Sequence, residues 1–482
     1  ADCNFNGASA AALVSEAYEQ GVSLLVLPEL CLTGYTCSDL FLQESLLDGA
    51  GKALLTLTEA TRDKNMVVLA GLPLTVNGVL YNVAAVLHDG DILGFVPKSY
   101  LPTYSEFYEG RHYHSGTDIE ADVLFNGRTY PFGTRLLFRC RQMPAFTLGI
   151  EICEDLWVAQ PPSISHALAG ATVIANLSAS DETTGKDIYR RSLVSGQSAR
   201  LVCGYIYADA GEGESSTDLV FGAHNLICEN GSILAESERF SNQMIMADMD
   251  MSKLISERRR MTTWQPKFDN GYRVIDFDLE MHEVDLRRFI DPHPFVPDDA
   301  MDRTRRCEEI LTIQAMGLKK RLAHTHCRHA VVGISGGLDS TLALLVTVRA
   351  FDMLDMDRSQ IMAVTMPCFG TTDRTYHNAC ELVRRLGATL EEVDIKEAVT
   401  LHFSDIGQDP ANHDVTYENG QARERTQVLM DIANRLGGRV IGTGDMSELA
   451  LGWATYNGDH MSMYGVNASV PKTLVRHLGR YC

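Results

Sequence analysis

The sequence lacks any run of about 18 apolar residues, and its start lacks a basic segment followed by an apolar one. We therefore expect no membrane-spanning helix, no membrane partner and no secretion signal. Positive charge is also scarce, with 42 Lys and Arg against 63 Asp and Glu and a net charge of −21, which argues against nucleic acid as a partner. The twelve cysteines lack the spacing of a disulfide framework, so we expect reduced thiols and a cytoplasmic location.

What the sequence does contain is the composition of a globular protein, with 45% hydrophobic and 22% charged residues in 482 positions. This length favours two or three domains with alternating helices and strands, an α/β class. Residues 11–20 have a helical pattern, and residues 21–28, 66–70, 81–87, 91–96 and 146–152 have strand patterns. Three prolines within residues 292–297 indicate a stiff boundary. We expect a first domain over 1–265, a linker over 266–300 and a second domain over 301–482.

A glycine turn in the second half suggests a phosphate site. Residues 331–334 form a buried-strand run that leads into Ser335, Gly336 and Gly337, and an apolar segment of helix length follows. Such a turn at a helix N-terminus leaves backbone N–H groups free for an anion. Asp339 fits beside phosphate if a Mg²⁺ ion stands between the two anions. An ordinary strand-turn-helix corner is the plainer alternative.

A second turn of the same design follows residues 439–442 and delivers Glu448. If both turns lie at the carboxyl edge of one parallel sheet, Asp339 and Glu448 can bind the same Mg²⁺. Helix capping is the alternative role for each acid.

Three reactive side chains in the first half each follow a buried strand: Glu29, Lys98 and Cys153. Taken singly, they could be a rim salt-bridge partner, a surface cation and an inert packed thiol. Together they supply a base, a cation for an oxyanion and a nucleophile, which amide or nitrile hydrolysis through a thioester requires. A cysteine at a strand exit, before a helix N-terminus, can also be held as a thiolate.

The local sequences around these three residues, at 28–35, 98–104 and 149–157, resemble the nitrilase superfamily, and the likeness extends over about residues 1–265. It implies an α-β-β-α sandwich in which Cys153 is the nucleophile, Glu29 the general base and Lys98 the oxyanion partner. Glu109 resembles the family's second glutamate. In the glutaminase branch, Tyr104 and Ser180 fall at glutamine-binding positions. Lys186 does too, although relatives carry arginine there, and an ammonium cannot form the bidentate contact of a guanidinium.

The segment from Ser335 to Ser340 resembles the pyrophosphate loop of the N-type ATP pyrophosphatases, which cleave ATP to AMP and pyrophosphate while adenylating a substrate oxygen. It departs from the Walker pattern because no Gly-Lys-Ser/Thr follows. The resemblance implies a doubly wound parallel sheet of the adenine nucleotide alpha hydrolase type. It also implies an ATP site made by Ser335, Gly336, Gly337, Leu338, Asp339, Ser340 and Thr443.

Residues 416–426 and 449–459 closely resemble NAD synthetases. This likeness implies a deamido-NAD site made by Asn419, Glu424, Arg425, Thr426, Gln427, Glu448, Trp453, Ala454, Thr455 and Tyr456. The aromatic side chains suit stacking on a pyridine ring.

The whole chain is similar to the glutamine-dependent NAD synthetases. The resemblance implies a carbon-nitrogen ligase that releases ammonia from L-glutamine and amidates ATP-activated deamido-NAD. Because free ammonia is mostly non-nucleophilic ammonium near neutral pH, we expect it to pass directly through the protein. It implies Mg²⁺ as cofactor, ATP as co-substrate and a homo-oligomer of two or more copies. Family members continue past residues 467–472 and start one strand before Ala1, so we expect both ends to be incomplete.

Two alternatives stay open. Another glutamine-dependent amidoligase with the same two domains would use a different carboxylate acceptor. A non-enzymatic scaffold that kept a nucleotide pocket is the second, and the Glu29, Lys98 and Cys153 set speaks against it.

Overall fold

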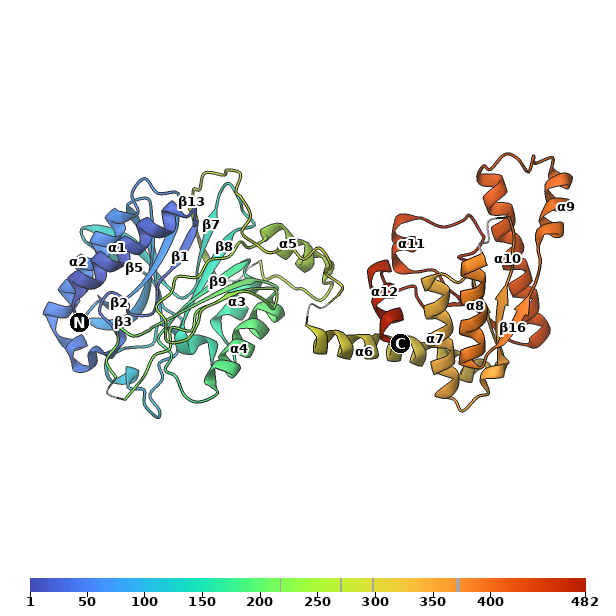
Figure 1. Ribbon diagram of the computed structural model, residues 1–482. Helices are drawn as coiled ribbons and strands as arrows, with labels where there is room; N and C mark the ends of the chain where they lie inside the picture. Colours follow the sequence, from blue (N-terminus) through green and yellow to red (C-terminus); the bar gives the residue numbers. More distant parts are fainter. Residues whose placement is uncertain (217, 269–270, 297–298, 370–372) are drawn as a thin grey trace. The chain divides into compact units, whose positions relative to one another are not determined.

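The computed structural model describes residues 1–216, 218–268, 271–296, 299–369 and 373–482. The chain divides into two compact units, Ala1–Phe289 and Ile290–Cys482 (Figure 1). Residues 269–270 and 297–298 of the predicted linker lie outside the described residues, and the limits 266–300 stay a prediction. No described helix combines the length and the apolar character needed to cross a membrane.

The first unit contains two sheets. One has the order β1-β2-β3-β4-β6-β5 and the other β12-β11-β10-β9-β8-β7-β13. The strands of the first sheet are β1 (Leu24–Val26), β2 (Val67–Val76), β3 (Val79–His88), β4 (Asp91–Pro97), β5 (Glu120–Phe125) and β6 (Arg128–Gly133). Those of the second sheet are β7 (Leu136–Cys140), β8 (Thr147–Ile152), β9 (Val173–Ser178), β10 (Gly204–Asp209), β11 (Leu226–Glu229), β12 (Ser232–Glu236) and β13 (Arg273–Phe277). The helices are α1 (Cys3–Glu19), α2 (Glu44–Ala60), α3 (Pro162–Leu168), α4 (Lys186–Leu201) and α5 (Met251–Arg260).

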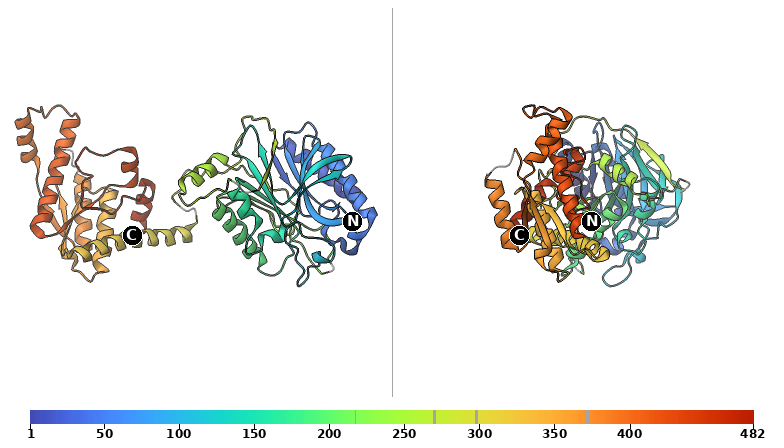
Figure 2. Two further views of the ribbon diagram at one scale, coloured as in Figure 1. Left: turned by 180° about the vertical axis from the view of Figure 1, so that it is seen from behind. Right: turned by 90° about the vertical axis from the view of Figure 1, so that its right-hand side faces the viewer.

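The side-chain period of β2 explains the four layers of this unit. Val68 and Ala70 pack with α1 and α2 in one apolar cluster, whereas Val67 and Leu69 pack against the second sheet in another. Successive side chains of a strand point to opposite faces, so a strand that is apolar throughout is covered on both sides. Helices α1 and α2 lie side by side on the outer face (Figures 1 and 2), and α3 and α4 pack on the second sheet. The predicted α-β-β-α sandwich is confirmed.

Two element limits differ from the expected ones. The helix predicted over 11–20 begins at Cys3, because the Asp2 carboxylate caps it by accepting a bond from the Phe5 N–H at 3.0 Å. The strand predicted over 21–28 spans only Leu24–Val26. Glu29, three residues after its end, belongs to the site described below.

The second unit contains one parallel sheet of order β16-β15-β14-β17-β18. Its strands are β14 (Ala330–Gly333), β15 (Ile361–Thr365), β16 (Thr389–Glu392), β17 (Arg439–Gly442) and β18 (Tyr464–Gly465). Its helices are α6 (Ala300–Thr325), α7 (Leu338–Asp352), α8 (Asp373–Leu386), α9 (Lys396–Ile406), α10 (Val415–Leu436), α11 (Met446–Leu451) and α12 (Lys472–Tyr481).

Both faces of this sheet are covered. Val332 packs in a cluster with α6, α7 and α12, and Val331 packs on the other face with α10. The strand order reverses between β14 and β17, and ligands bind at such reversals beyond the carboxyl ends of the strands. The predicted doubly wound sheet is therefore confirmed, and both glycine turns lie at its reversal point.

Candidate active sites

The first site is built around a buried ammonium group. Lys98 follows β4, and its Nζ lies 2.7 Å from Glu29 Oε1 and 2.6 Å from Glu109 Oε1. Glu29 follows β1, and Glu109 begins the short 3-10 helix η2 (Glu109–Arg111). All three side chains are buried. The structure thus brings together the predicted base, the oxyanion cation and the second glutamate.

Neighbouring donors fix both carboxylates. Glu29 accepts bonds from Asn82 Nδ2 at 2.6 Å and from the Ala179 N–H at 3.0 Å. The Tyr35 hydroxyl donates to Glu109 at 2.8 Å. These bonds hold each carboxylate against the Lys98 ammonium in one geometry.

Burial and neighbouring charges shift the pKa values of Glu109 and Lys98. The pKa of Glu109 is raised to about 7. Burial is the main cause, the positive charge of Lys98 opposes it, and the negative charge of Glu29 adds to it. Burial by itself lowers the pKa of Lys98, yet Glu109 and Glu29 hold it well above its ordinary value. Lys98 is therefore charged, and the raised pKa of Glu109 favours its protonated form at a higher pH than is usual for a carboxyl group.

Cys153 follows β8 directly and begins the 3-10 helix η3 (Cys153–Leu156). Burial raises the pKa of its thiol well above the ordinary value, and the Glu29 charge adds to this more than Lys98 opposes it. The expectation of a resting thiolate is therefore wrong, because one ammonium shared by two carboxylates does not offset desolvation of the sulfur. Of the two carboxylates, Glu29 raises the pKa of the thiol more than Glu109 does.

Two of the residues predicted to bind glutamine, Tyr104 and Lys186, lie beside η3. The Tyr104 hydroxyl donates to Glu154 at 2.8 Å, and the Tyr104 ring packs edge-on against Phe107. Lys186 Nζ lies 5.8 Å from the centre of the Phe107 ring and 5.3 Å from that of Trp157. Lys186 also pairs with the buried carboxylate of Asp181. Its charge therefore already has an acidic partner.

Ser180 forms hydrogen bonds with a buried polar network. Its N–H donates to Asp209 at 2.8 Å, and its hydroxyl accepts from Arg190 at 3.2 Å. Arg190 is fully buried and also pairs with Glu182. Sequence reasoning missed these supporting groups, because a charged residue on an amphipathic helix gives no sign that it points inward.

The second site begins at the Ser-Gly-Gly turn between β14 and α7. Gly336 has φ +79, which favours glycine, and Gly337 is the N-cap of α7. The Ser335 hydroxyl accepts from the Gly337 N–H at 3.3 Å and lies 3.2 Å from the Ser340 hydroxyl. Leu338, the first helical residue, is half exposed. The turn lies at the N-terminus of α7 as the sequence predicts, and its role as a phosphate site stays a prediction.

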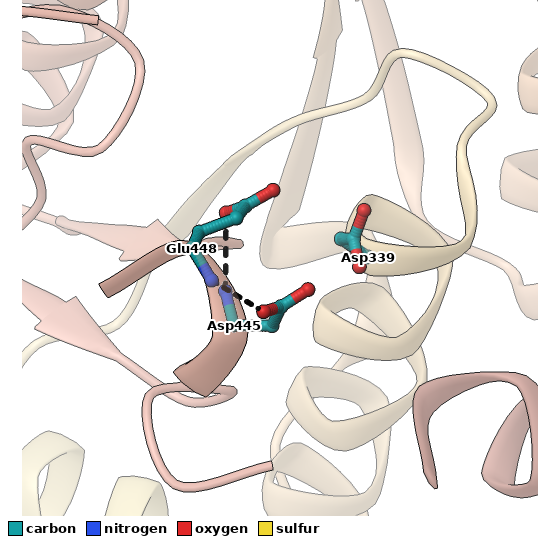
Figure 3. Close-up of side chains that lie close together, drawn as sticks. All are labelled: Asp339, Asp445 and Glu448. Carbon is teal, nitrogen blue, oxygen red and sulfur yellow. Dashed lines mark hydrogen bonds between the residues drawn. The ribbon is translucent and has the colours of Figure 1, made fainter. Parts of the chain in front are cut away.

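Three carboxylates meet above this turn (Figure 3). One ligand oxygen from each of Asp339, Asp445 and Glu448 lies within 4.8 Å of the others, the single group of this kind in the described part of the chain. Asp445 is the buried N-cap of α11, where its side chain accepts from the Glu448 N–H at 2.9 Å. Sequence analysis placed Asp339 and Glu448 together but missed Asp445. Its position directly after the Gly442–Gly444 turn was the available signal.

An ammonium group completes the cluster. Lys472 Nζ lies 2.8 Å from Asp339, 2.9 Å from Asp445 and 3.4 Å from Glu448. One oxygen of Asp339, Oδ1, is buried without a hydrogen-bond partner among the described residues. Three carboxylates that gather around a positive charge and leave one oxygen free suit a hard divalent cation such as Mg²⁺.

Asn467 joins the two glycine turns. Its buried Nδ2 donates to the Asp339 carbonyl at 2.9 Å and to the Thr443 carbonyl at 3.0 Å. Thr443, predicted beside ATP, therefore lies next to the pyrophosphate turn. Asn467 and Lys472 lie in a segment to which sequence reasoning gave no role.

The residues predicted for deamido-NAD lie on α10 and on the loop after α11. Asn419 accepts from the Tyr456 N–H at 3.1 Å, and Arg425 forms a two-bond pair with Asp459 at 2.9 and 2.7 Å. Thr455 accepts from the Asp459 N–H at 2.9 Å. The structure brings the helix and the loop together through these contacts.

The remaining predicted residues divide by exposure. Trp453 and Tyr456 are 81% and 73% exposed, so their rings are available for stacking. Ala454 and Gln427 are exposed, Glu424 is partly buried, and the Thr426 hydroxyl is bonded within α10 to the Ala422 carbonyl at 3.1 Å.

Comparison with known proteins places both sites in context. The carbon-nitrogen hydrolase family model matches residues 4–259, and the NAD synthase family model matches residues 310–482. The chain is 45% identical to the glutamine-dependent NAD(+) synthetase of Mycobacterium tuberculosis H37Rv over 99% of its own length and 72% of the relative's. The corresponding protein of Mycobacterium leprae is 44% identical over 100% and 73%, and that of Thermotoga maritima is 29% identical over 96% and 76%.

Proposed function

Because this chain belongs to the glutamine-dependent NAD(+) synthetase family, we propose that it releases ammonia from L-glutamine and uses ATP to amidate deamido-NAD, yielding NAD, AMP and pyrophosphate. A ligase with a different acceptor is not favoured, because relatives that match nearly the whole chain are named glutamine-dependent NAD(+) synthetases.

In the first unit, Glu29 takes the proton of the Cys153 thiol, and the sulfur attacks the carboxamide carbon of glutamine. The Lys98 ammonium stabilises the oxyanion, and Glu29 gives its proton to the leaving nitrogen, so that ammonia departs and the thioester remains. Glu29 then takes a proton from water, which hydrolyses the thioester to glutamate, and returns that proton to the Cys153 sulfur. Glu109 orients Lys98 through their 2.6 Å contact. Tyr104, Ser180 and Lys186 bind the amino-acid end of glutamine.

In the second unit, the turn from Ser335 to Ser340, with Thr443 beside it, holds the phosphates of ATP. Asp339 and Glu448, joined by Asp445, would hold Mg²⁺, which neutralises phosphate charge when bound. Deamido-NAD binds along α10 and the loop at residues 453–456, at Asn419, Glu424, Arg425, Thr426 and Gln427. Its carboxylate oxygen displaces pyrophosphate from the α-phosphorus, and ammonia then displaces AMP.

The observation that carries the first half-reaction is the placement of Lys98 between Glu29 and Glu109, 2.7 and 2.6 Å from their oxygens and shielded from water. The charges of Glu29, Lys98 and Glu109 all act on the pKa of the Cys153 thiol. Such a buried charged cluster has little structural purpose, because packed apolar groups would be at least as stable there.

The test is Cys153→Ala. Glutamine-dependent synthesis should fall by a factor on the order of 10⁴ or more, while synthesis from added ammonium chloride continues at the unmodified rate. Cys228→Ala, a buried cysteine of β11, is the matched control. A parallel loss of both rates would contradict separate sites for ammonia release and ammonia use.

We also propose Mg²⁺ as the cofactor, a cytoplasmic location and a homo-oligomer. The carboxylate cluster supports the first, the twelve free cysteines support the second, and the third is proposed by analogy with the family alone.

A further inference from the structure

Asn176, on β9, contacts the backbone of Cys153 with both ends of its amide. Its Oδ1 accepts from the Cys153 N–H at 2.9 Å, and its Nδ2 donates to the Cys153 carbonyl at 3.5 Å. Asn176 is fully buried, and its register partner on β8 is Glu151, two residues before the nucleophile. The proposed chemistry gives Asn176 no role, so these two bonds need another explanation.

The backbone of Cys153 needs such support. Its φ of +43 lies in the left-handed region, which is unfavourable for a residue with a side chain. Strained residues persist where surrounding contacts hold them, and they occur at reactive sites. A side-chain amide is suited to this task because it carries one acceptor and one donor a fixed distance apart, which a carboxylate or an apolar group cannot offer.

The amide of Asn176 is in turn held in place. Its Nδ2 also donates to the Tyr205 hydroxyl at 3.2 Å, and that hydroxyl donates to Glu151. Glu151 accepts a further bond from the Ser163 N–H at 2.8 Å. Asn176, Tyr205 and Glu151 are all buried. This chain of bonds crosses three adjacent strands, β8, β9 and β10, and fixes which end of the amide faces the Cys153 N–H.

We infer that Asn176 is a positioning residue that holds Cys153 in its strained conformation for attack, and that Tyr205 and Glu151 keep its amide in register. This inference rests on the proposed role of Cys153 as the nucleophile. It predicts that loss of the amide slows attack by the sulfur without weakening the binding of glutamine, because Asn176 bonds the backbone of the nucleophile.

The test uses the full chain and 6-diazo-5-oxo-L-norleucine, an electrophilic glutamine analogue that alkylates a nucleophilic thiol. Its maximal inactivation rate, kinact, and its half-saturation concentration, KI, are measured for Asn176→Ala and Tyr205→Phe. The matched control is Tyr130→Phe, which removes a largely buried hydroxyl bonded to Asp91 at 3.0 Å on the other sheet. Ammonia-dependent synthesis by each preparation reports on the second unit, and peptide mass spectrometry locates the adduct.

We expect kinact to fall about tenfold or more in Asn176→Ala, since small displacements of a reacting group are costly. Tyr205→Phe should lower it about threefold or more, the effect of one buried hydrogen bond. KI and ammonia-dependent synthesis should stay within about twofold of the unmodified protein. Asn176→Asp should keep a lowered kinact, because a carboxylate has no N–H to donate to the Cys153 carbonyl.

An unchanged kinact in Asn176→Ala, or a change confined to KI, would overturn the inference. If Asn176→Ala loses its fold, seen as aggregation or a lower thermal midpoint, Tyr205→Phe decides, and equality of its kinact with that of Tyr130→Phe is the negative result. Absence of the adduct from Cys153 in the unmodified protein would instead refute the proposed nucleophile.

Discussion

At the scale of single residues, the first site is a problem of charge compensation. One buried ammonium, Lys98, faces two carboxylates, Glu29 and Glu109, and the nearby thiol of Cys153 stays protonated. Each charge is tolerable only because its partners are in contact, since an unpaired buried ion costs several kcal/mol. Substitutions here therefore affect both catalysis and stability.

Lys98→Met should remove glutamine hydrolysis and also lower the free energy of unfolding by about 3–5 kcal/mol, because two buried carboxylates lose their cation. Differential scanning calorimetry measures the change. The double variant Lys98→Met with Glu29→Gln should recover part of the stability and none of the activity. An unchanged thermal midpoint in Lys98→Met would mean that water already solvates the pair.

Glu109 should make stability depend on pH. Burial raises its folded pKa to about 7 from its ordinary 4.5, so the fold binds a proton that the unfolded chain has lost. Its stabilising contribution is complete below the unfolded pKa of 4.5 and is lost as pH rises through the folded pKa of about 7. The free energy of unfolding falls by up to about 3 kcal/mol over this range.

The comparison for this prediction is Glu109→Gln, which cannot titrate. Between about pH 5 and about pH 8 the unmodified protein should lose free energy of unfolding relative to this variant, as followed by chemical denaturation. A constant difference across this range would show that Glu109 ionises at its ordinary pKa.

At the scale of elements, the second site is formed where helices begin. Asp339 lies in the first turn of α7, Asp445 caps α11 and Lys472 is the first residue of α12. Helix N-termini favour negative charge, so this arrangement stabilises carboxylates and a bound phosphate. Lys472 is in contact with all three acids, so its ammonium group would compete with a divalent cation for the same oxygens.

Lys472→Met should therefore tighten Mn²⁺ binding in the absence of nucleotide, because the competing ammonium is gone. Lys472 is half exposed, so we expect a modest gain of about three- to tenfold in affinity. Titration of the free-Mn²⁺ EPR signal measures it. Lys396→Met, an exposed lysine at the start of α9, is the control. Equal or weaker binding by Lys472→Met would show that the ammonium does not compete with the cation.

At the scale of the whole molecule, the chain contains two compact units with different chemistry. Asp339→Asn should lower synthesis from glutamine and from ammonium chloride by about tenfold or more, because both routes need activated deamido-NAD. Glutamate release from glutamine should remain measurable in the same preparation. Ser359→Ala, on the surface of the second unit, serves as control. Loss of glutamate release with retained synthesis would reverse the assignment of the two sites.

Sequence patterns alone predicted an α/β class, the two glycine turns and the reactive residues at strand ends. The sandwich, the doubly wound sheet and the other site residues were predicted from family resemblance. Strand ends, glycine turns and reactive residues are local signals, because each depends on the order of a few neighbouring residues. Glu29, Lys98 and Cys153 could be grouped because each follows a buried strand. Asp339 and Glu448 could be paired because their turns share one design.

Only the tertiary structure decided the supporting contacts and the charge states. Four supporting residues could be identified only from contacts between strands and helix ends that are distant in sequence: Asn176, Asp445, Asn467 and Lys472. The protonated thiol of Cys153 also depends on desolvation and on charges brought from β1 and β4. Burial and electrostatic coupling are properties of distance in space, which a linear order of residues does not specify.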